Sequence, residues 1–383
     1  MFSSTNTISK HNSAASDASA TESHMTAANS LKVQQQKSVY SGLGSEAMAR
    51  VAVFQAFSQS PALFVNKYSV QKVIGFGSNG VVLAATQGSS VVAIKIIYKS
   101  KPSLHAAFPA EVEILKHLNS DPSTSSHLLK YIEDWQDVNN FYVVTELFGS
   151  DWLSSVSSSE PELKPISFPF KFNGSVISVS FPISAGSSDL WAWSYAHRAY
   201  MNQTEGHSFL PLSPVKQIVK QVALALKEMH SKGFYHGDLK IENVLVHQSS
   251  QGPQVRLADF GHTKHTSFGI KAYGTAEVSA PEFLSDSPFA SSTIDGRAAD
   301  VFALGMILYV LLSGDGLVPP TVQQVMKGKV GYAGLVSCNY GEYPLGDLPD
   351  LDDDAWELMF AMTRVDPTVR ITVDQVLAHP FFG

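Results

Sequence analysis

The first regular pattern of hydrophobic and polar positions begins near Lys67. Apolar and polar residues alternate over 68–83 around several glycines, which predicts two strands joined by a glycine-rich turn. The next apolar patterns predict three more strands and one helix, in chain order strand 90–98, helix 104–118, strand 131–135 and strand 141–147. This part of the chain is therefore expected to form a small, mostly antiparallel sheet with one helix.

Beyond Phe148 the apolar positions recur every three or four residues, which is typical of helices packed on a core. Ser213 followed by Pro214 predicts an N-cap and a first helical residue, and an apolar stripe follows from Val215 to Met229. Further helices are expected over 299–312, 322–326, 354–363 and 373–378. The predicted fold class is α+β, with a sheet lobe over 67–148 and a mainly helical lobe over 149–382.

The segment 150–188 departs from the helical pattern. Two runs of alternating apolar residues, 166–172 and 177–183, flank Asn173-Gly174, and Asn-Gly in such a place is a strong hairpin signal. A two-residue turn would pair Phe170 with Ile177, and Phe168 with Val179, on one face. We expect a β-hairpin insertion packed on the larger, helical lobe; the alternative is a disordered loop.

Residues 1–60 are rich in Ser, Ala, Thr, Asn and Gln and predict a disordered tail, in which 46–58 is the one stretch that could form a short helix. The chain has 383 residues, of which 44% are hydrophobic, which is enough for one large domain or two lobes besides this tail.

The net charge of −7 comes without any basic run, which argues against nucleic-acid and anionic-membrane partners. A single cysteine, Cys338, excludes an intrachain disulfide and fits a reducing compartment. The N-terminus has no signal-peptide pattern, and the longest apolar run, 301–312, is too short to span a bilayer. We therefore expect a cytoplasmic or nuclear protein, or one found in both places.

The turn between the first two predicted strands reads Gly75, Phe76, Gly77, Ser78, Asn79 and Gly80. Glycines allow backbone N–H groups to close over phosphates, although such a turn alone is most often only a turn. A strand follows rather than a helix, which disfavours a Rossmann fingerprint. The absence of Gly-Lys-Ser/Thr in the turn disfavours a Walker P-loop.

Lys95 ends the third predicted strand, where a fixed ammonium could reach the phosphates of a nucleotide held by the glycine turn. A lysine at this place is otherwise most often a surface residue. To be held in place it needs a carboxylate from the following helix. Glu111 shares a helix face with Leu115 and Leu118, so we expect it to point inward and to pair with Lys95. Glu113 is expected to face solvent.

A polar stretch, 236–243, follows the long amphipathic helix. Asp238 could accept or orient the proton of a hydroxyl, Lys240 could neutralise a transferring phosphoryl group, and Asn243 could ligate Mg²⁺. Asp259, in the run Leu257-Ala258-Asp259-Phe260-Gly261, is placed to ligate the same metal. The alternative for each segment is an ordinary polar turn.

In combination these residues resemble the eukaryotic protein kinase family. The glycine turn, Lys95, Glu111, the stretch 236–243, Asp259-Phe260-Gly261 and Ala280-Pro281-Glu282 occur in the family order, and the resemblance covers about 68–382. It implies the bilobal protein kinase fold and transfer of the γ-phosphoryl group of ATP with Mg²⁺ as cofactor. Lys240 and Gly274-Thr275 resemble serine/threonine kinases, and 274–282 resembles the calmodulin-dependent kinase group near PAS kinase.

The resemblance also assigns roles to single residues. The implied ATP-binding residues are Ile74, Gly75, Phe76, Gly77, Ser78, Asn79, Gly80, Val82, Ala93, Lys95, Thr145, Glu146, Phe148, Asp189 and Leu245. The implied catalytic residues are Asp238 as base, Lys240, Lys95, Glu111 and Thr275, which would bond to Asp238 and Lys240; the implied metal ligands are Asn243 and Asp259. Thr145 would be a small gatekeeper, which predicts an accessible back pocket.

Other positions resemble the supporting structure of the family. Asp300 would brace the catalytic loop, and Arg370 would pair with Glu282. A spine of stacked side chains would include Leu115, His236 and Phe260. Glu242 matches a position that often favours a basic residue before the phosphoacceptor.

One position departs from the family pattern. Gly237 stands where the family usually has an arginine that binds an activation-loop phosphate. Phosphorylation of Thr263, Thr266 or Ser267 should then have less to act on, so we expect activity that does not require it.

The implied partners are proteins with Ser or Thr hydroxyls, with basic residues as a further feature of the motif, and the chain is expected to be a monomer. A pseudokinase-like scaffold that binds nucleotide and protein partners is the alternative from another class. A kinase for a small molecule or lipid is a third reading, against which Thr275 and Ala280-Pro281-Glu282 argue.

Overall fold

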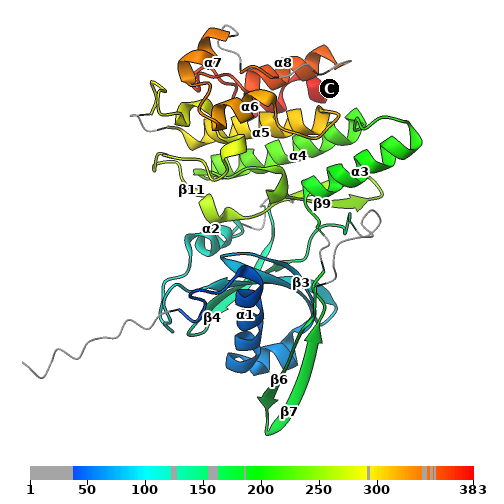
Figure 1. Cartoon of the computed structure of the whole chain (residues 1–383), viewed down its shortest axis with the longest axis vertical. Coiled ribbons are helices and arrows are strands. Elements are labelled where there is room, and N and C mark those ends of the chain that lie inside the picture. The colour runs from blue at the N-terminus through cyan, green and yellow to red at the C-terminus, as the bar shows by residue number, and fades with distance from the viewer. Residues whose placement is uncertain are drawn as a thin grey trace, which may run out of the picture. The chain divides into compact units, whose positions relative to one another are not determined.

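The computed structural model describes residues 38–121, 127–153, 163–184, 187–290, 294–338, 343–345, 348 and 351–383. Residues 1–37 of the tail predicted over 1–60 lie outside these residues. Within them the chain forms a β-sheet lobe and a helical lobe, as the sequence predicts (Figure 1).

The N-terminal lobe contains a five-stranded antiparallel sheet. Its strands lie in the order β1 (Ser69–Phe76), β2 (Gly80–Gln87), β3 (Ser90–Tyr98), β5 (Asn140–Glu146) and β4 (Tyr131–Gln136). The alternating residues Val92, Ile94 and Ile96 of β3 are buried, as a period of two requires. Helix α2 (Ala110–Leu118) begins later than predicted, because Pro109 disfavours helical geometry at the residue before it.

The C-terminal lobe is mainly helical. Its helices are α3 (Leu190–Thr204), α4 (Leu212–Ser231), α5 (Gly296–Leu312), α6 (Pro320–Met326), α7 (Tyr332–Cys338), α8 (Asp353–Met362) and α9 (Val373–Leu377). Its short strands are β8 (Phe234–Tyr235), β9 (Val244–Ser249), β10 (Gly252–Leu257) and β11 (Lys264–His265). In the described part of the chain, none of the helices is both long and apolar enough to cross a membrane.

The predicted start of α4 is wrong by two positions. The N-cap is Pro211, and Ser213 lies inside the first turn without capping it. Proline fits in the first turn of a helix because the N–H groups there have no partner within the helix. Pro214 therefore does not set the start of the helix, which begins at Leu212.

Single helical turns complete the chain. They are a π-helical turn at Leu63–Lys67 and 3₁₀ turns at Ile241–Asn243, Phe260–His262, Ala276–Val278, Pro281–Phe283 and Pro380–Phe382.

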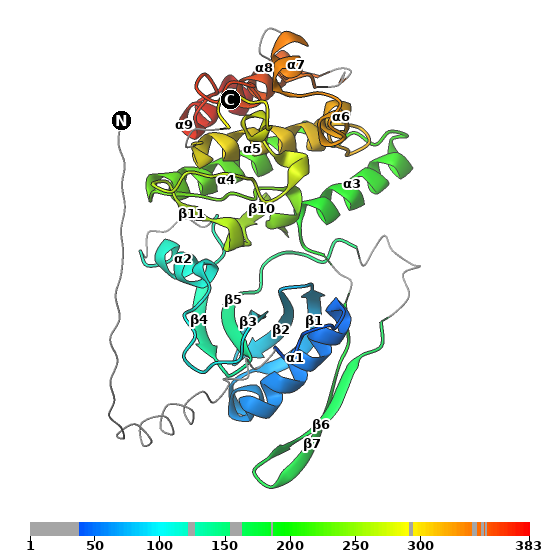
Figure 2. The same cartoon turned by 60° about the vertical axis from the view of Figure 1, so that its left-hand side comes forward.

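The disorder predicted up to residue 60 is wrong for residues 38–60. Helix α1 (Ser45–Gln59) lies across the N-terminal lobe (Figure 2), and it buries Ala49, Ala52, Val53, Ala56 and Phe57. These positions recur every three or four residues, which is the spacing that a helix needs to bury one face. The short helix expected over 46–58 is thus confirmed, and the folded domain begins well before residue 67.

The hairpin predicted in the insertion is confirmed. Strand β6 (Ile166–Phe172) pairs with β7 (Ser175–Phe181), with Phe170 opposite Ile177 and Phe168 opposite Val179. Asn173 and Gly174 both have positive φ, at 49° and 78°, as the favoured two-residue turn requires.

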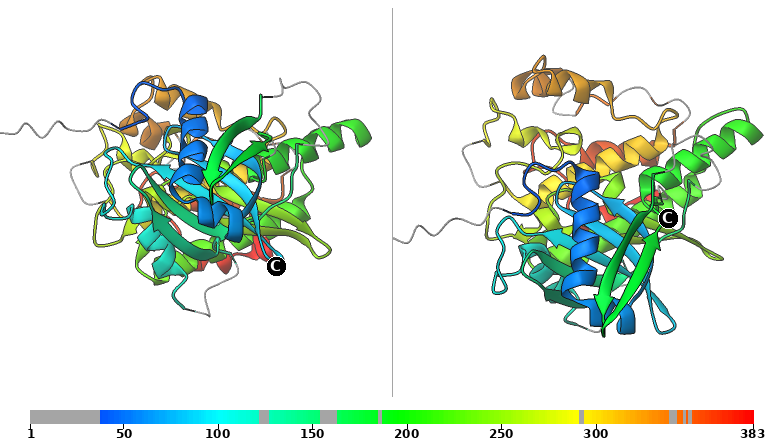
Figure 3. Two further views of the ribbon diagram at one scale, coloured as in Figure 1. Left: turned by 90° about the horizontal axis from the view of Figure 1, so that it is seen from below. Right: turned by 60° about the horizontal axis from the view of Figure 1, so that its bottom comes forward.

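The expected location of this hairpin on the helical lobe is wrong, because it packs on the N-terminal lobe beside α1 (Figure 3). Phe57 of α1 contacts Phe168, Phe170 and Phe181 of the hairpin, with ring centroids 5.6, 5.2 and 5.3 Å apart. The apolar stripe of α1 thus supplies the cover that the apolar face of the hairpin needs. This partner could not be predicted, because the composition of 38–60 predicts disorder.

The base of the hairpin is joined to the edge of the five-stranded sheet. The Val73 N–H donates to the Pro182 carbonyl at 3.0 Å, and the Ser184 N–H donates to the Val73 carbonyl at 2.9 Å. Val73 lies on β1, which leads directly into the glycine-rich turn. The insertion is therefore part of the structure that positions this turn.

Phe57 is the centre of the packing between α1 and the hairpin, with 2% of its surface exposed. We expect Phe57→Ala to lower the free energy of unfolding by about 3–5 kcal/mol, because a buried aromatic ring leaves a cavity. Phe54→Ala is the comparison, since Phe54 also contacts Phe168 of the hairpin, with ring centroids 5.4 Å apart, but is 44% exposed, and it should cost about 1 kcal/mol or less. Urea denaturation measures both, and equal losses would contradict the packing described here.

Candidate active site

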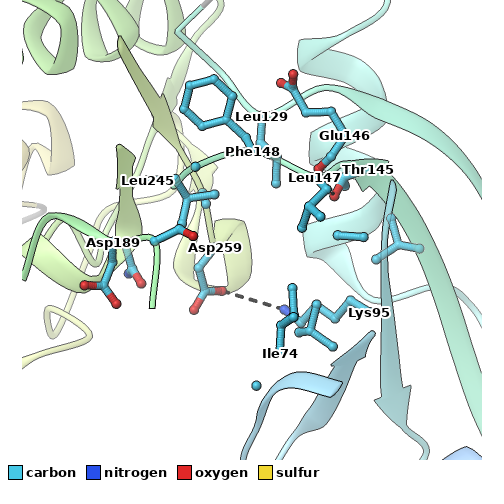
Figure 4. A pocket seen from close by; sticks show the side chains of 18 of the residues that line it. Ile74, Lys95, Leu129, Thr145, Glu146, Leu147, Phe148, Asp189, Leu245 and Asp259 are labelled. Carbon is cyan, nitrogen blue, oxygen red and sulfur yellow. Dashed lines mark hydrogen bonds and ion pairs between the residues drawn. The ribbon is translucent and has the colours of Figure 1, made fainter. Parts of the chain in front are cut away.

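A cavity of about 500 Å³ lies between the two lobes (Figure 4). Its walls come from β1, β2, β3 and α2 of the N-terminal lobe, from β9 of the C-terminal lobe and from the segment 145–149 that joins the lobes. Cavities of this size bind cofactors and nucleotides in other proteins.

Apolar side chains form one end of the cavity. Ile74, Val82 and Ala93 line it from the sheet, and Leu245 lines it from β9. All four are among the residues that the resemblance implies for ATP binding, and the structure brings them together around one slot.

The segment 145–149 forms the back edge of this slot, with Thr145, Glu146, Leu147 and Phe148 in sequence (Figure 4). The Glu146 carboxylate accepts hydrogen bonds from the Arg256 guanidinium and the Lys130 N–H, both at 3.0 Å. These partners hold the carboxylate, and the Glu146 N–H donates to the Lys130 carbonyl at 3.0 Å, so the Glu146 carbonyl is the polar group left to face a ligand.

The same cavity extends beyond the gatekeeper position. Thr145 is 7% exposed, and Val112, Leu115, Val143 and Phe260 also line the cavity. This agrees with the back pocket expected behind a small residue at 145. Leu129, Val143, Leu147 and Ala258 line the cavity too and were missed, because an apolar side chain carries no local sign that separates a ligand contact from core packing.

Lys95 is held by two carboxylates. Its ammonium lies 2.7 Å from Glu111 Oε2 and 3.9 Å from Asp259 Oδ1. Burial lowers the pKa of Lys95, but the carboxylates of Glu111 and Asp259 outweigh it and raise this pKa above its ordinary value. Glu113 is 59% exposed and pairs with Lys116, so the predicted assignment of the two glutamates agrees with the structure.

Asp259 begins the Phe260–His262 turn in a left-handed conformation, with φ of 60°. Burial raises the pKa of its carboxyl, but Lys95 and the Gly261 N–H lower it below its usual value, so the carboxylate is ionised at neutral pH. Asn243 donates from Nδ2 to the Asp238 carbonyl at 2.8 Å, which leaves its Oδ1 as the available ligand atom. An ionised carboxylate and an amide oxygen fit a hard cation such as Mg²⁺.

The predicted base, Asp238, is buried beside the ammonium group of Lys240, which also contacts the Thr275 hydroxyl. Lys240 Nζ lies 3.2 Å from Asp238 Oδ2 and donates to Thr275 Oγ1 at 2.8 Å. Asp238 Oδ1 is buried and has no hydrogen-bond partner among the described residues, so it can accept a proton or a hydroxyl. The predicted contact of Thr275 with Lys240 is present, whereas its predicted bond to Asp238 is not among those found in the described residues.

The catalytic loop, residues 236–243, is held by hydrogen bonds to Asp300 of α5. Asp300 Oδ2 accepts from the His236 N–H at 2.7 Å, and Oδ1 accepts from the Gly237 N–H at 3.0 Å. The expected brace is therefore present. Arg370 likewise forms its expected pair with Glu282 through two contacts of 2.8 Å, with both side chains fully buried.

Gly237 could not be replaced by arginine in this loop. Its φ is +77°, and a Cβ atom there would lie 2.7 Å from the His262 carbonyl oxygen. Both the backbone angle and this contact exclude a side chain. The departure from the family pattern is thus built into the local backbone.

The glycine-rich turn closes on itself, with the Gly77 N–H donating to the Gly80 carbonyl at 2.9 Å. Its residues 76–80 do not line the first cavity; they line an adjoining one that shares Gly75, Val82, Lys95 and Asp259 with it. This is a place where phosphates that extend from the first cavity would meet the turn.

Asp189 lines the mouth of the cavity together with Ser187 and Ser188. It is also the N-cap of α3, accepting from the Ala192 N–H at 2.8 Å, and it accepts from the Ser187 hydroxyl. Its position fits the acidic residue expected after the insertion, although part of its hydrogen-bonding capacity is used by the helix.

Comparison with known proteins agrees with this geometry. The family described as "Protein kinase domain" matches residues 192–382. The calcium/calmodulin-dependent protein kinase type 1 of Caenorhabditis elegans is 30% identical over 43% of this chain and 45% of its own length. Human serine/threonine-protein kinase D3 is 31% identical over 45% of this chain and 18% of its own length.

A longer match covers both lobes. A serine/threonine-protein kinase of Drosophila persimilis is 26% identical over 84% of this chain and 35% of its own length. The chain spans less than half the length of these curated relatives. With the family match, the relatives and the assembled site together, the chain belongs to the eukaryotic protein kinase family.

Proposed function

We propose that this protein is a serine/threonine protein kinase that transfers the γ-phosphoryl group of ATP to Ser and Thr hydroxyls of proteins. The observation that carries the proposal is the position of Lys95, which lies between Glu111 at 2.7 Å and Asp259 at 3.9 Å. Phosphoryl transfer in kinases depends on positioning and charge stabilisation, which this arrangement supplies in advance.

Each charged group of the site has one task in this reaction. Lys95 binds the α- and β-phosphates while Glu111 fixes its direction. Asp238 orients the substrate hydroxyl through its free Oδ1 and accepts its proton as the oxygen bonds to the γ-phosphorus, while the bond from this phosphorus to the bridging oxygen breaks and ADP leaves. Lys240, held between Asp238 and Thr275, offsets the charge on the transferring group.

Asn243 and Asp259 would hold Mg²⁺, which would neutralise charge on the bound phosphates. The carboxylates of Glu111, Asp238 and Asp259 outnumber the ammonium groups of Lys95 and Lys240 in this site. The site alone therefore lacks the positive charge needed for a polyphosphate, and a divalent cation would supply it.

Two further features belong to this proposal. The residues that follow Gly274 resemble a platform for a peptide, which favours protein over small-molecule substrates. Glu242 is exposed at the edge of the cavity, where its carboxylate would attract a basic residue near the phosphoacceptor.

The first test is transfer of labelled γ-phosphate from ATP to a Ser/Thr peptide library with and without Mg²⁺. Asp238→Asn should lower kcat on the order of 10²–10⁴-fold, since the amide cannot accept the proton. A folded protein that binds ATP but transfers no phosphate would favour the alternative, a scaffold that binds nucleotide and protein partners.

The ion pair of Lys95 gives a second prediction. Glu111→Gln should lower kcat/KM for ATP on the order of tenfold or more, because Lys95 loses its charged partner. Glu113→Gln removes the same charge two residues away on the exposed side of α2 and should leave kcat/KM within about twofold. Steady-state kinetics at varied ATP concentration measures both, and equal effects would refute the role of Glu111.

The missing arginine at 237 gives a third prediction. Thr263 is 2% exposed and donates to the His236 carbonyl, so Thr266 and Ser267 are the accessible acceptors of the three. The double variant Thr266→Ala, Ser267→Ala should keep at least about half of the wild-type kcat, because no arginine is present at 237 to bind a phosphate there. A near-complete loss of activity in this variant would show that phosphorylation is required.

A further inference from the structure

The activation segment, residues 260–282, contacts the catalytic loop near both of its ends. At its start, β11 pairs with β8, so that Lys264 lies opposite Tyr235 and His265 opposite Phe234. The Thr263 hydroxyl also donates to the His236 carbonyl at 3.2 Å. These contacts use only the backbone and an unmodified side chain, so the question is what fixes the other end of the segment.

Tyr273 provides the contact at the other end. Its hydroxyl accepts a hydrogen bond from the Leu239 N–H at 3.0 Å and donates to Asp300 Oδ1 at 2.8 Å. Leu239 directly follows Asp238 in the chain, and Asp300 is the carboxylate that braces the loop. A single phenol therefore connects the activation segment, the catalytic loop and α5.

The surroundings of this phenol suit a permanent contact. Tyr273 is 7% exposed, and burial beside Asp300 raises its pKa well above the usual value. The hydroxyl is therefore protonated and able to donate at any physiological pH. The Leu239 N–H, which is also buried, would be left without this acceptor if the hydroxyl were removed.

The neighbouring glycines make the position of the segment critical for Asp238. The Gly274 N–H donates to the Gly237 carbonyl at 2.9 Å, and a Cβ atom at 274 would lie 2.5 Å from Asp238 Cγ. The chain beside Tyr273 thus touches the side chain of Asp238 directly. A shift of the segment by a fraction of an ångström would displace this carboxylate.

We propose that Tyr273 is a positioning residue for phosphoryl transfer, which orients Asp238 by joining Leu239 to Asp300 from within the unmodified activation segment. It takes the part that an arginine–phosphate contact plays in relatives with an arginine at position 237. The proposal rests on the kinase activity proposed above and deepens it.

The test is Tyr273→Phe, which removes one oxygen atom and keeps the ring. We expect kcat to fall about tenfold with KM for ATP within about twofold, because the hydroxyl orients the loop and does not touch the nucleotide cavity. An unchanged kcat would overturn the proposal. A fall in kcat together with a changed KM for ATP and a lower thermal stability would also overturn it, since that is the result of a purely structural role.

Tyr235→Phe is the matched control. Tyr235 is buried next to the same loop, and its hydroxyl has no hydrogen-bond partner within the described residues. Removing this hydroxyl should leave kcat unchanged. A loss equal to that of Tyr273→Phe would overturn the proposal, because any buried hydroxyl would then have the same effect.

Hydrogen–deuterium exchange of the peptide 236–243 supplies a readout that needs no activity. Tyr273→Phe should speed the exchange of this peptide, whose Leu239 N–H has lost its acceptor, and Tyr235→Phe should not. If the wild type transfers no phosphate, the proposed function fails while exchange still decides whether Tyr273 holds the loop. Unchanged exchange in Tyr273→Phe would overturn the proposal in either case.

Discussion

The geometry of the site depends on one buried carboxylate, that of Asp300. It is completely shielded from solvent on α5, where an ionised group is very costly unless hydrogen bonds compensate for the lost water. The compensation comes from the His236 and Gly237 N–H groups, the Tyr273 hydroxyl and His230. Because the carboxylate needs these donors, the segments that carry them cannot move far from it. The catalytic loop is thus fixed to α5, a helix in which nearly every residue is buried.

The same constraint explains why glycine occurs at 237 and 274. The loop must bring two consecutive N–H groups to one carboxylate, and this forces Gly237 into the left-handed region with the His262 carbonyl against it. The activation segment then lies so close that residue 274 has no room for a side chain. At both positions atoms of a neighbouring segment occupy the space that a side chain would need. The resulting backbone contacts, rather than an arginine, hold the activation segment.

Much of the site could be predicted from the sequence because its charged and polar residues lie in short, recognisable sequence motifs. Lys95, Asp238, Asn243 and Asp259 each sit at the end of a recognisable strand or turn, and the helical period alone selected Glu111 over Glu113. The hairpin register followed from Asn173-Gly174 for the same reason, since a two-residue turn determines every pair beyond it. Where the hairpin packs could not be predicted, because its partner Phe57 is more than a hundred residues earlier and alternation says only that one face is buried.

The role of Tyr273 could not be predicted from the sequence for a related reason. The sequence around Tyr273 does not indicate that its hydroxyl lies between Leu239 and Asp300. That position results from how α5, the catalytic loop and the segment pack together. Roles that depend on three elements meeting at one atom become visible only in the structure.

The insertion adds a constraint between the lobes that a single connecting segment would not provide. After residue 149 the chain first contacts the C-terminal lobe, where the Ser150 N–H donates to the Val246 carbonyl at 3.0 Å. It then reaches the N-terminal lobe, where the Arg50 guanidinium on α1 donates to the Lys164 and Pro165 carbonyls at 2.6 and 3.0 Å. It returns at Ser188, whose carbonyl accepts from the Val246 N–H at 2.7 Å.

The chain therefore runs between the lobes twice more after the segment 145–149, once toward the hairpin and once back from it. One of these passes is hydrogen-bonded to β1 beside the glycine-rich turn and then supplies Asp189 at the mouth of the cavity. Any opening of the cleft must move the hairpin with the N-terminal lobe while Ser188 stays with β9. Pro182 and Ser184, which bond to β1, lie only a few residues before Ser188 and Asp189 in the chain, so neighbouring parts of one segment contribute to both sides of the cavity.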